Sequence, residues 1–306
     1  MTTIGTSTSA FYERAVTDLG ALRTEAEGLQ ASLSSGQRLT RSSDDPVAAS
    51  RLRQLSRADA RSGIDTANAR RAATDLQLTD GALSNLADYV IRVKELATQA
   101  ANGTLTDAQR IGLGQEIAAI RQNVLQLANG RDAAGGALFG GQSTGDAYTL
   151  DGGGNALYTG TANAPELPLG DGQTVNSALT GPQVLNFTGS GGSTDLLAAL
   201  KVLGEALQAG GSAAQGAARN GISDMNGALD AITTAQTVVG ARLNWLDLTD
   251  ERRTNLSEMR ADEQDVVGGT DIAFTIARLQ QTMTVLEASQ ASFTRLANLS
   301  LFNLLN

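Results

Sequence analysis

The residue types that most often carry catalytic chemistry are missing or isolated in this sequence. Its 306 residues include no cysteine and no histidine, which excludes disulfides, thiolate nucleophiles, Cys-based zinc sites and serine–histidine catalysis. Adjacent carboxylates occur at Asp262 and Glu263, but they lie in a segment with a helical pattern, and nothing nearby predicts a cleft. We therefore predict no catalytic residue, no metal site and no cofactor, and we predict that the protein is not an enzyme. Composition alone leaves open a peptidoglycan hydrolase that uses two carboxylates, which zymography would test.

Three other local patterns could bind ligands, and each has a simpler structural interpretation. Asp44 and Asp45 could hold a metal ion, but short acidic residues directly before Pro46 are typical of a helix N-cap. Gly152–Gly154 could cradle a phosphate, but no helix with a lysine follows, so the tip of a hairpin is favoured. Trp245 could be a carbohydrate platform, although packing on a long helix is the more ordinary role.

The chain is acidic, with a net charge of −9 and a pI of about 4.6. The basic stretch from residue 51 to 71 is interleaved with Asp59 and Asp65, which is typical of a solvated helical face rather than of a phosphate-binding track. No run approaches 18 apolar residues. We therefore expect neither a nucleic-acid partner nor a membrane partner. The first residues also lack the basic and apolar regions of a Sec-type signal peptide, which on its own would predict a cytoplasmic protein.

Both ends of the chain carry an apolar heptad pattern, with spacings that alternate between three and four residues. The N-terminal seam is Tyr12, Ala15, Leu19, Leu22, Ala26, Leu29 and Leu33. The C-terminal seam is Ile272, Ile276, Leu279, Met283, Leu286, Gln290, Phe293 and Ala297, and the helix is expected to continue through Leu301 and Phe302. Neither stripe has a local partner, and an isolated helix of this length is marginal in water. We therefore predict that the terminal seams pair with each other and with neighbouring copies, the alternative being an ordinary intramolecular core.

Before the middle of the chain, two antiparallel helices are predicted. The first runs from Pro46 to about residue 100, with its best apolar run at Leu76, Thr79, Leu83, Leu86, Val90, Val93 and Ala97. A tight turn at Asn102-Gly103 follows, and Thr106 with Gln109 forms a capping box that opens the second helix. The second helix should end at about residue 129.

After the middle of the chain, helical patterns resume. One helix is expected from about residue 194, and a longer one from about 219 to 264. The longer helix has its seam at Ile222, Met225, Leu229, Ile232, Gln236, Val239, Leu243 and Leu246. Polar residues then occupy the seam near Arg253, which predicts a change of register there.

The region from about residue 130 to 192 differs in composition from the rest. It holds roughly half of the 34 glycines and three of the four prolines. Short strands are predicted at 148–150, 156–158, 166–169, 173–175 and 183–187, the first two joined as a hairpin around Asp151–Asn155. Because loop closure costs little, we expect residues 141–190 to be replaceable by a short link.

Together these patterns predict a mainly α fold: an elongated helical rod with paired N- and C-terminal coiled-coil helices and a small β-rich central insert. The predicted domains are an inner terminal coiled coil (1–40 and 266–306), a helical rod (41–139 and 194–265) and the insert, which we define as residues 140–193.

Three segments, in this order, resemble characteristic segments of the bacterial flagellin family. Residues 33–39 read Leu-Ser-Ser-Gly-Gln-Arg-Leu, residues 43–50 read Ser-Asp-Asp-Pro-Val-Ala-Ala-Ser, and residues 95–104 read Glu-Leu-Ala-Thr-Gln-Ala-Ala-Asn-Gly-Thr. The resemblance covers essentially the whole chain. It implies terminal helices that form an inner coiled coil, a helical rod domain and a variable insert.

Three further segments resemble the branch of the family that joins the flagellar hook to the filament, rather than filament flagellin. They are Asp-Pro-Val-Ala-Ala at 45–49, Leu-Phe-Gly-Gly at 138–141 and Leu-Ser-Leu-Phe-Asn-Leu-Leu at 299–305. Asn303 and Leu304 stand where that branch usually has Asp and Tyr, which keeps filament flagellin as the alternative. A second alternative, of another class, is an extracellular adhesin or glycan-binding module.

The resemblance implies a structural subunit in bacterial motility. Its implied partners are copies of itself, a neighbouring hook-associated protein on the hook side, flagellin on the filament side and an export chaperone. The implied location is the extracellular flagellum, reached through the flagellar export channel without a cleaved signal peptide.

Overall fold

The computed structural model describes residues 4–304, and it describes side chains from Ala10 to Leu296 apart from Phe11. The chain divides into two compact units: Met1–Ala60 with Leu256–Asn306, and Arg61–Asn255. The fold is mainly α, as predicted, with long helices at both ends and short antiparallel strand pairs in the central region. The three-part domain division remains a prediction.

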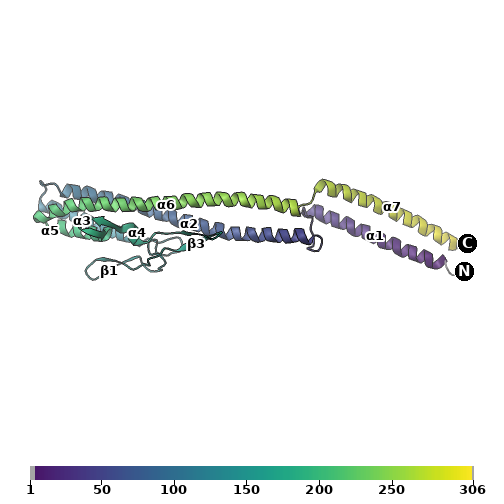
Figure 1. Ribbon diagram of the computed structural model, residues 1–306. Coiled ribbons are helices and arrows are strands. Elements are labelled where there is room, and N and C mark those ends of the chain that lie inside the picture. Colours follow the sequence, from purple (N-terminus) through teal and green to yellow (C-terminus); the bar gives the residue numbers. More distant parts are fainter. Residues whose placement is uncertain (1–3, 305–306) are drawn as a thin grey trace. The chain divides into compact units, whose positions relative to one another are not determined.

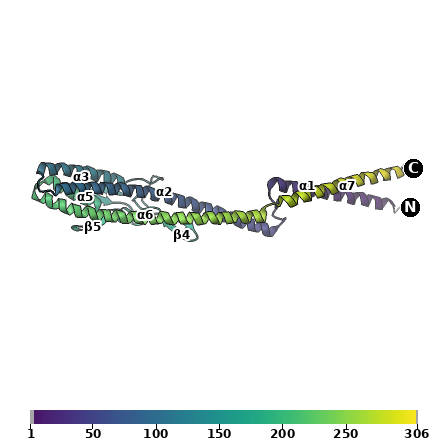
Figure 2. The same cartoon turned by 90° about the horizontal axis from the view of Figure 1, so that it is seen from above.

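In the first unit, the terminal helices α1 (Ile4–Ser35) and α7 (Ile272–Leu304) lie side by side (Figures 1 and 2). They are antiparallel, because Tyr12 meets Phe293 while Glu25 meets Arg278. Gly36 ends α1 with a positive φ of 70°, a conformation that glycine adopts without a steric penalty.

The segment that follows α1 and the segment that precedes α7 are hydrogen-bonded to each other. The N–H of Arg38 donates to the carbonyl of Gly268 at 2.8 Å, and the N–H of Thr270 donates to the carbonyl of Gly36 at 3.0 Å. An isolated antiparallel bridge pairs Gln37 with Gly269. The two links are therefore a short paired joint rather than two independent tethers.

The predicted helix starts in the first half of the chain are confirmed. Helix α2 (Pro46–Ala100) begins at the proline, and Asp45 accepts a hydrogen bond from the N–H of Ala48 at 3.0 Å. Helix α3 (Asp107–Ala128) begins with the predicted capping box of Thr106 and Gln109.

The region between α3 and α5 forms three separate two-stranded antiparallel sheets. They pair β1 (Tyr148–Leu150) with β2 (Ala156–Tyr158), β3 (Glu166–Gly170) with β4 (Gln173–Asn176), and β5 (Asn186–Gly189) with β6 (Gly192–Asp195). The strand predicted at 183–187 is wrong in its first part, which is a short helix, α4 (Gly181–Leu185). The reason is Pro182 at the helix start behind Thr180, a pattern typical of a helix N-terminus.

The insert shares one hydrophobic core with the helices of the second unit. Leu169, Val184, Leu185 and Phe187 are buried, and they belong to the same cluster as residues of α2, α3, α5 (Leu196–Ala209) and α6 (Gly211–Gly268). This packing argues against the expectation that a short link can replace residues 141–190 at little cost. Loop closure is a small term, whereas each buried side chain of this size contributes roughly 1.5–3 kcal/mol.

Helix α6 is longer than predicted and continuous. It begins at Gly211 rather than near residue 219, and it ends at Gly268. Near residue 250 the buried face continues through Thr249 and Arg253, so polar residues occupy the seam without interrupting the helix.

Candidate functional site: the terminal helix pair and the anchored insert

The predicted seam of α1 forms one half-buried face. Leu19, Leu22, Leu29 and Leu33 all lie on it. At its N-terminal end, the rings of Tyr12 and Phe293 meet edge to face with centroids 5.5 Å apart. The four leucines are thus on the side of α1 that the heptad spacing predicts.

On α7, the face that packs against α1 includes only some of the residues of the predicted C-terminal seam. Leu279, Leu286 and Phe293 are half-buried, but the most deeply buried residues on this face are Thr275 and Thr282, exposed by 7% and 4%. The predicted residues Ile272, Ile276 and Met283 are exposed by 59%, 43% and 48%. Leu301 and Phe302 lie outside the described side chains. Small threonines let the two helices approach closely, and the larger apolar residues flank that contact.

The exposed residues form an uncovered apolar stripe along α7. Ile272, Ile276 and Met283 follow heptad spacing on one side of the helix, whereas Phe274 and Val285 lie exposed about 160–180° around it, on the other side of the buried face. A contiguous exposed apolar stripe of this kind marks an interaction surface in a folded protein.

An open groove runs between α1 and α7. It has a volume of 380 Å³. Its lining is mainly apolar: Ala15, Asp18, Leu19, Leu22, Val285, Ala288, Ser289, Ser292, Phe293 and Leu296. The leucines of α1 therefore have side-chain surface that α7 alone does not cover.

Two of the segments that resemble the flagellin family meet at the paired links. The guanidinium of Arg38 lies 3.3 Å from the carboxylate of Asp45 and donates to the carbonyl of Val267 at 3.0 Å. Hydrogen bonding from the N–H of Ala48, followed by the bond from Arg38, lowers the pKa of Asp45. The pKa of Asp44 is lowered chiefly by the N–H of Arg41. Both aspartates have capping and turn roles, so the capping interpretation accounts for them without a metal.

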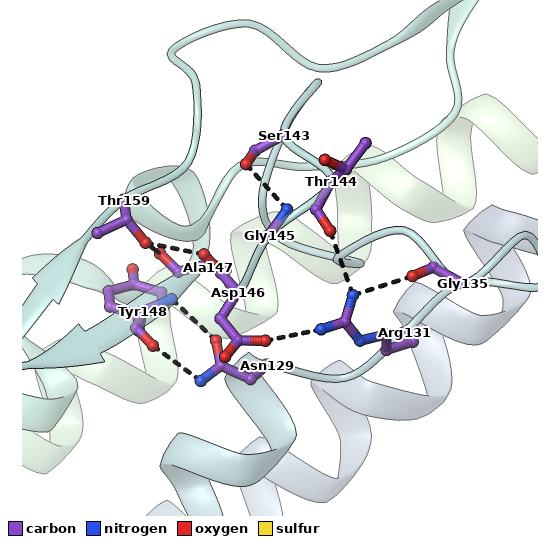
Figure 3. Close-up of polar contacts among 10 residues, drawn as sticks. All are labelled: Asn129, Arg131, Gly135, Ser143, Thr144, Gly145, Asp146, Ala147, Tyr148 and Thr159. Atoms are coloured by element: carbon purple, nitrogen blue, oxygen red, sulfur yellow. Dashed lines mark hydrogen bonds and ion pairs between the residues drawn. The ribbon is translucent and has the colours of Figure 1, made fainter.

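The entry to the insert is fixed by two side chains at the end of α3 (Figure 3). Asn129 accepts from the N–H of Tyr148 at 2.8 Å and donates to its carbonyl at 2.9 Å, so its amide acts like a neighbouring strand for β1. Arg131 pairs with Asp146 at 2.7 Å and donates to the carbonyls of Gly135 and Thr144. Sequence reasoning identified Asn129 only as a helix stop, although an amide and a guanidinium beside a glycine-rich segment are suited to binding its backbone.

Helix side chains also hold the hairpins. Lys201 donates to the carbonyl of Gly153 at 2.6 Å, and Arg121 donates to that of Gly154 at 2.6 Å. Asn68 donates to the carbonyl of Pro168, and Arg242 donates to the carbonyls of Asn176 and Ala178. Gly152–Gly154 is thus a clamped hairpin tip, as predicted.

The other residues that the sequence analysis considered for a chemical role do not lie together in one site. Glu263 pairs with Arg51 at 2.8 Å, whereas its neighbour Asp262 is exposed. Trp245 is half-buried and packs against the core. Among residues 4–304, no group of histidine, cysteine or acidic side chains has the arrangement of a metal site. Within the same range, none of the helices combines the length and apolar character needed to cross a membrane.

Comparisons with known proteins show which proteins this chain resembles. Residues 7–144 match the family model of the bacterial flagellin N-terminal helical region. Flagellar hook-associated protein 3 of Escherichia coli is 27% identical over 97% of this chain and 98% of its own length.

Two solved structures show the same fold. A flagellar hook-associated protein from Vibrio parahaemolyticus has a TM-score of 0.67 at 23% identity and covers 72% of this chain and 98% of that chain. The flagellar junction protein FlgL from Legionella pneumophila has a TM-score of 0.60 at 16% identity and covers 71% of this chain and 99% of that chain.

The fold and the matched region define the class: residues 7–144 form a helical region of the bacterial flagellin N-terminal type. Over nearly its full length, the chain is a relative of flagellar hook-associated protein 3.

Proposed function

We propose that this protein is a structural subunit of the bacterial flagellum and forms the junction between hook and filament. The observation that carries the proposal is the similarity to flagellar hook-associated protein 3, which extends over both terminal helices, the long helices α2 and α6 and the insert. The family model, by contrast, spans only residues 7–144. Similarity along almost the whole chain supports a shared role more strongly than one shared helical region does.

The terminal helix pair supplies the surface for assembly in this proposal. The open groove between α1 and α7 leaves the leucines of α1 incompletely covered, and the stripe on α7 is exposed. Burial of apolar surface stabilises association by roughly 25 cal/mol per Å². A second copy that inserts its α7 stripe into or beside the groove would cover both surfaces. The twelve predicted assembly residues divide accordingly into those of the internal seam, those of the exposed stripe, and Leu301 and Phe302.

The other partners follow from the same similarity. The subunit would contact a hook-associated protein on one side and flagellin on the other, and it would bind an export chaperone before secretion. It would leave the cell through the flagellar export channel without a cleaved signal peptide. Its role would be structural rather than catalytic.

Electron microscopy of a strain that lacks this gene tests the proposal. We expect hooks without filaments, and flagellin released into the medium, because the filament has no junction on which to assemble. Complementation with the full chain should restore filaments. Deletion cells that still carry filaments on their hooks would refute the junction role. Loss of flagellin protein with intact junctions would instead indicate that the chain is a filament flagellin.

A pair of variants tests the assembly surface. Met283→Asp places a charge in the exposed stripe, so the monomer should fold normally but fail to incorporate. Thr284→Asp adds the same charge at an exposed position about 100° around the helix from both Met283 and the groove-lining Val285, and it should incorporate normally. Equal incorporation of the two variants, measured in isolated flagella, would refute the proposed role of the stripe.

A further inference from the structure

In the first unit, α2 and α6 lie against each other, and the charged side chains on the facing sides form ion pairs between the two helices. Asp59 pairs with Arg260 at 2.6 Å and accepts from Gln264 at 2.6 Å. Arg51 bonds both carboxylate oxygens of Glu263. These pairs leave no surplus charge on the face between the two helices.

The outer faces of the same two segments carry opposite surplus charges. On α2, Arg53 and Arg57 are exposed, and neither forms an ion pair within the described residues. On α6, Asp262 and Asp265 are exposed and are likewise free of ion pairs within that range. An α-helix turns about 100° per residue. Arg57 and Asp262 each lie two residues from a member of the Asp59–Arg260 pair, and so about 160° from the face between the helices.

The two charged rows also lie at matching heights. The segments run antiparallel, with Asp59 against Arg260 and Leu52 beside Gly268. In this register, Arg57 is level with Asp262 to within about one residue, and Arg53 is level with Asp265 to within about two. At a rise of about 1.5 Å per residue, these offsets are about 1.5 and 3 Å, which an arginine side chain can span.

We infer that the arginine row Arg53–Arg57 of one copy binds the acidic row Asp262–Asp265 of a second copy placed beside it with little axial displacement. Because the positive and negative rows lie on opposite outer faces of one helix pair, each copy binds one neighbour through each face. A contact of this head-to-tail type continues from copy to copy around a ring or lattice. The inference rests on the proposed function, since it identifies a neighbouring copy as the partner.

Charge exchange tests this contact in the full chain, expressed in the deletion strain. The variant Arg53→Glu/Arg57→Glu should abolish filament formation, and so should Asp262→Arg/Asp265→Arg, because each places like charges face to face. The fourfold variant exchanges the rows and should restore filaments on at least half of the hooks. Arg70→Glu/Arg219→Glu changes the net charge by the same amount at exposed positions elsewhere, and it should assemble like the wild type.

The results separate the contact from the general function. All variants should be secreted and should melt within about 3 °C of the wild type, since the substituted side chains are exposed. If either double variant assembles normally, or if the fourfold variant stays as defective as the doubles, the contact is refuted. Neither result would affect the junction role, which the phenotype of the deletion strain tests separately.

Discussion

The close crossing of α3 and α5 leads to a quantitative prediction for Gly114→Ala. A Cβ at position 114 would lie 2.9 Å from the carbonyl oxygen of Gly204 and 3.0 Å from Cβ of Leu207. Neither atom can rotate away, because one belongs to the backbone and the other is attached directly to it. The helices must therefore separate by about 0.5 Å, and overpacking of this kind costs about 1–3 kcal/mol.

Gly112→Ala in the same helix is the matched control. Gly112 is exposed, and a Cβ there meets no atom within 4 Å. Both substitutions gain the helix-propensity difference between glycine and alanine, up to about 1 kcal/mol. Gly112→Ala should therefore stabilise the second unit, whereas Gly114→Ala should be less stable than Gly112→Ala by about 1–3 kcal/mol.

Denaturant unfolding, followed by the fluorescence of Trp245, measures this difference. Trp245 is the single tryptophan of the chain, and it packs against the core of the second unit, so its signal reports on that unit. Two variants of equal stability would refute the close packing of α3 against α5.

Two further predictions concern the insert and the start of α2. Replacing residues 141–190 with a short Gly/Ser link should lower the melting temperature of the second unit by more than 10 °C, because it removes buried residues such as Phe187; calorimetry that shows an unchanged transition would contradict the shared core. At the start of α2, the lowered pKa of Asp45 means that the stabilisation by its carboxylate is present above about pH 4 and is lost as the pH falls through the folded-state pKa. Asp45→Asn keeps a capping oxygen without the titration, so the pH dependence of unfolding between about pH 4 and 2 should be weaker in this variant than in the wild type.

The heptad spacing predicts the helices better than it predicts their contact faces. On α2 every residue of the predicted run from Leu76 to Ala97 is buried. On α3 the buried positions include Gly114 and Ala128, each one residue beyond the apolar neighbours Leu113 and Leu127.

The same displacement by one residue occurs on α6 and α7. Gly221 and Thr282 are buried beside the predicted Ile222 and Met283. A pattern of apolar side chains selects the largest residues. Where helices approach closely, however, the contact is centred on small residues, and their proximity depends on a partner distant in the sequence.

The contacts of the insert could not be predicted from the sequence for a related reason. Its glycines and prolines correctly predict hairpins, but composition does not show what the hairpins contact. The carbonyls of its short strands are held by side chains from the helices, such as Asn129, Arg121 and Lys201. These polar side chains look like ordinary surface residues in the sequence, and only the fold shows that they bind backbone atoms.

The central claim is that this chain occupies the boundary between hook and filament, and immunogold microscopy of isolated flagella tests it most directly. A short epitope inserted at Gly152–Gly153 would report the position of the chain, because this hairpin tip is exposed. We predict a single band of gold at the hook–filament boundary of each flagellum and none elsewhere. Labelling along the length of the filament would contradict the account.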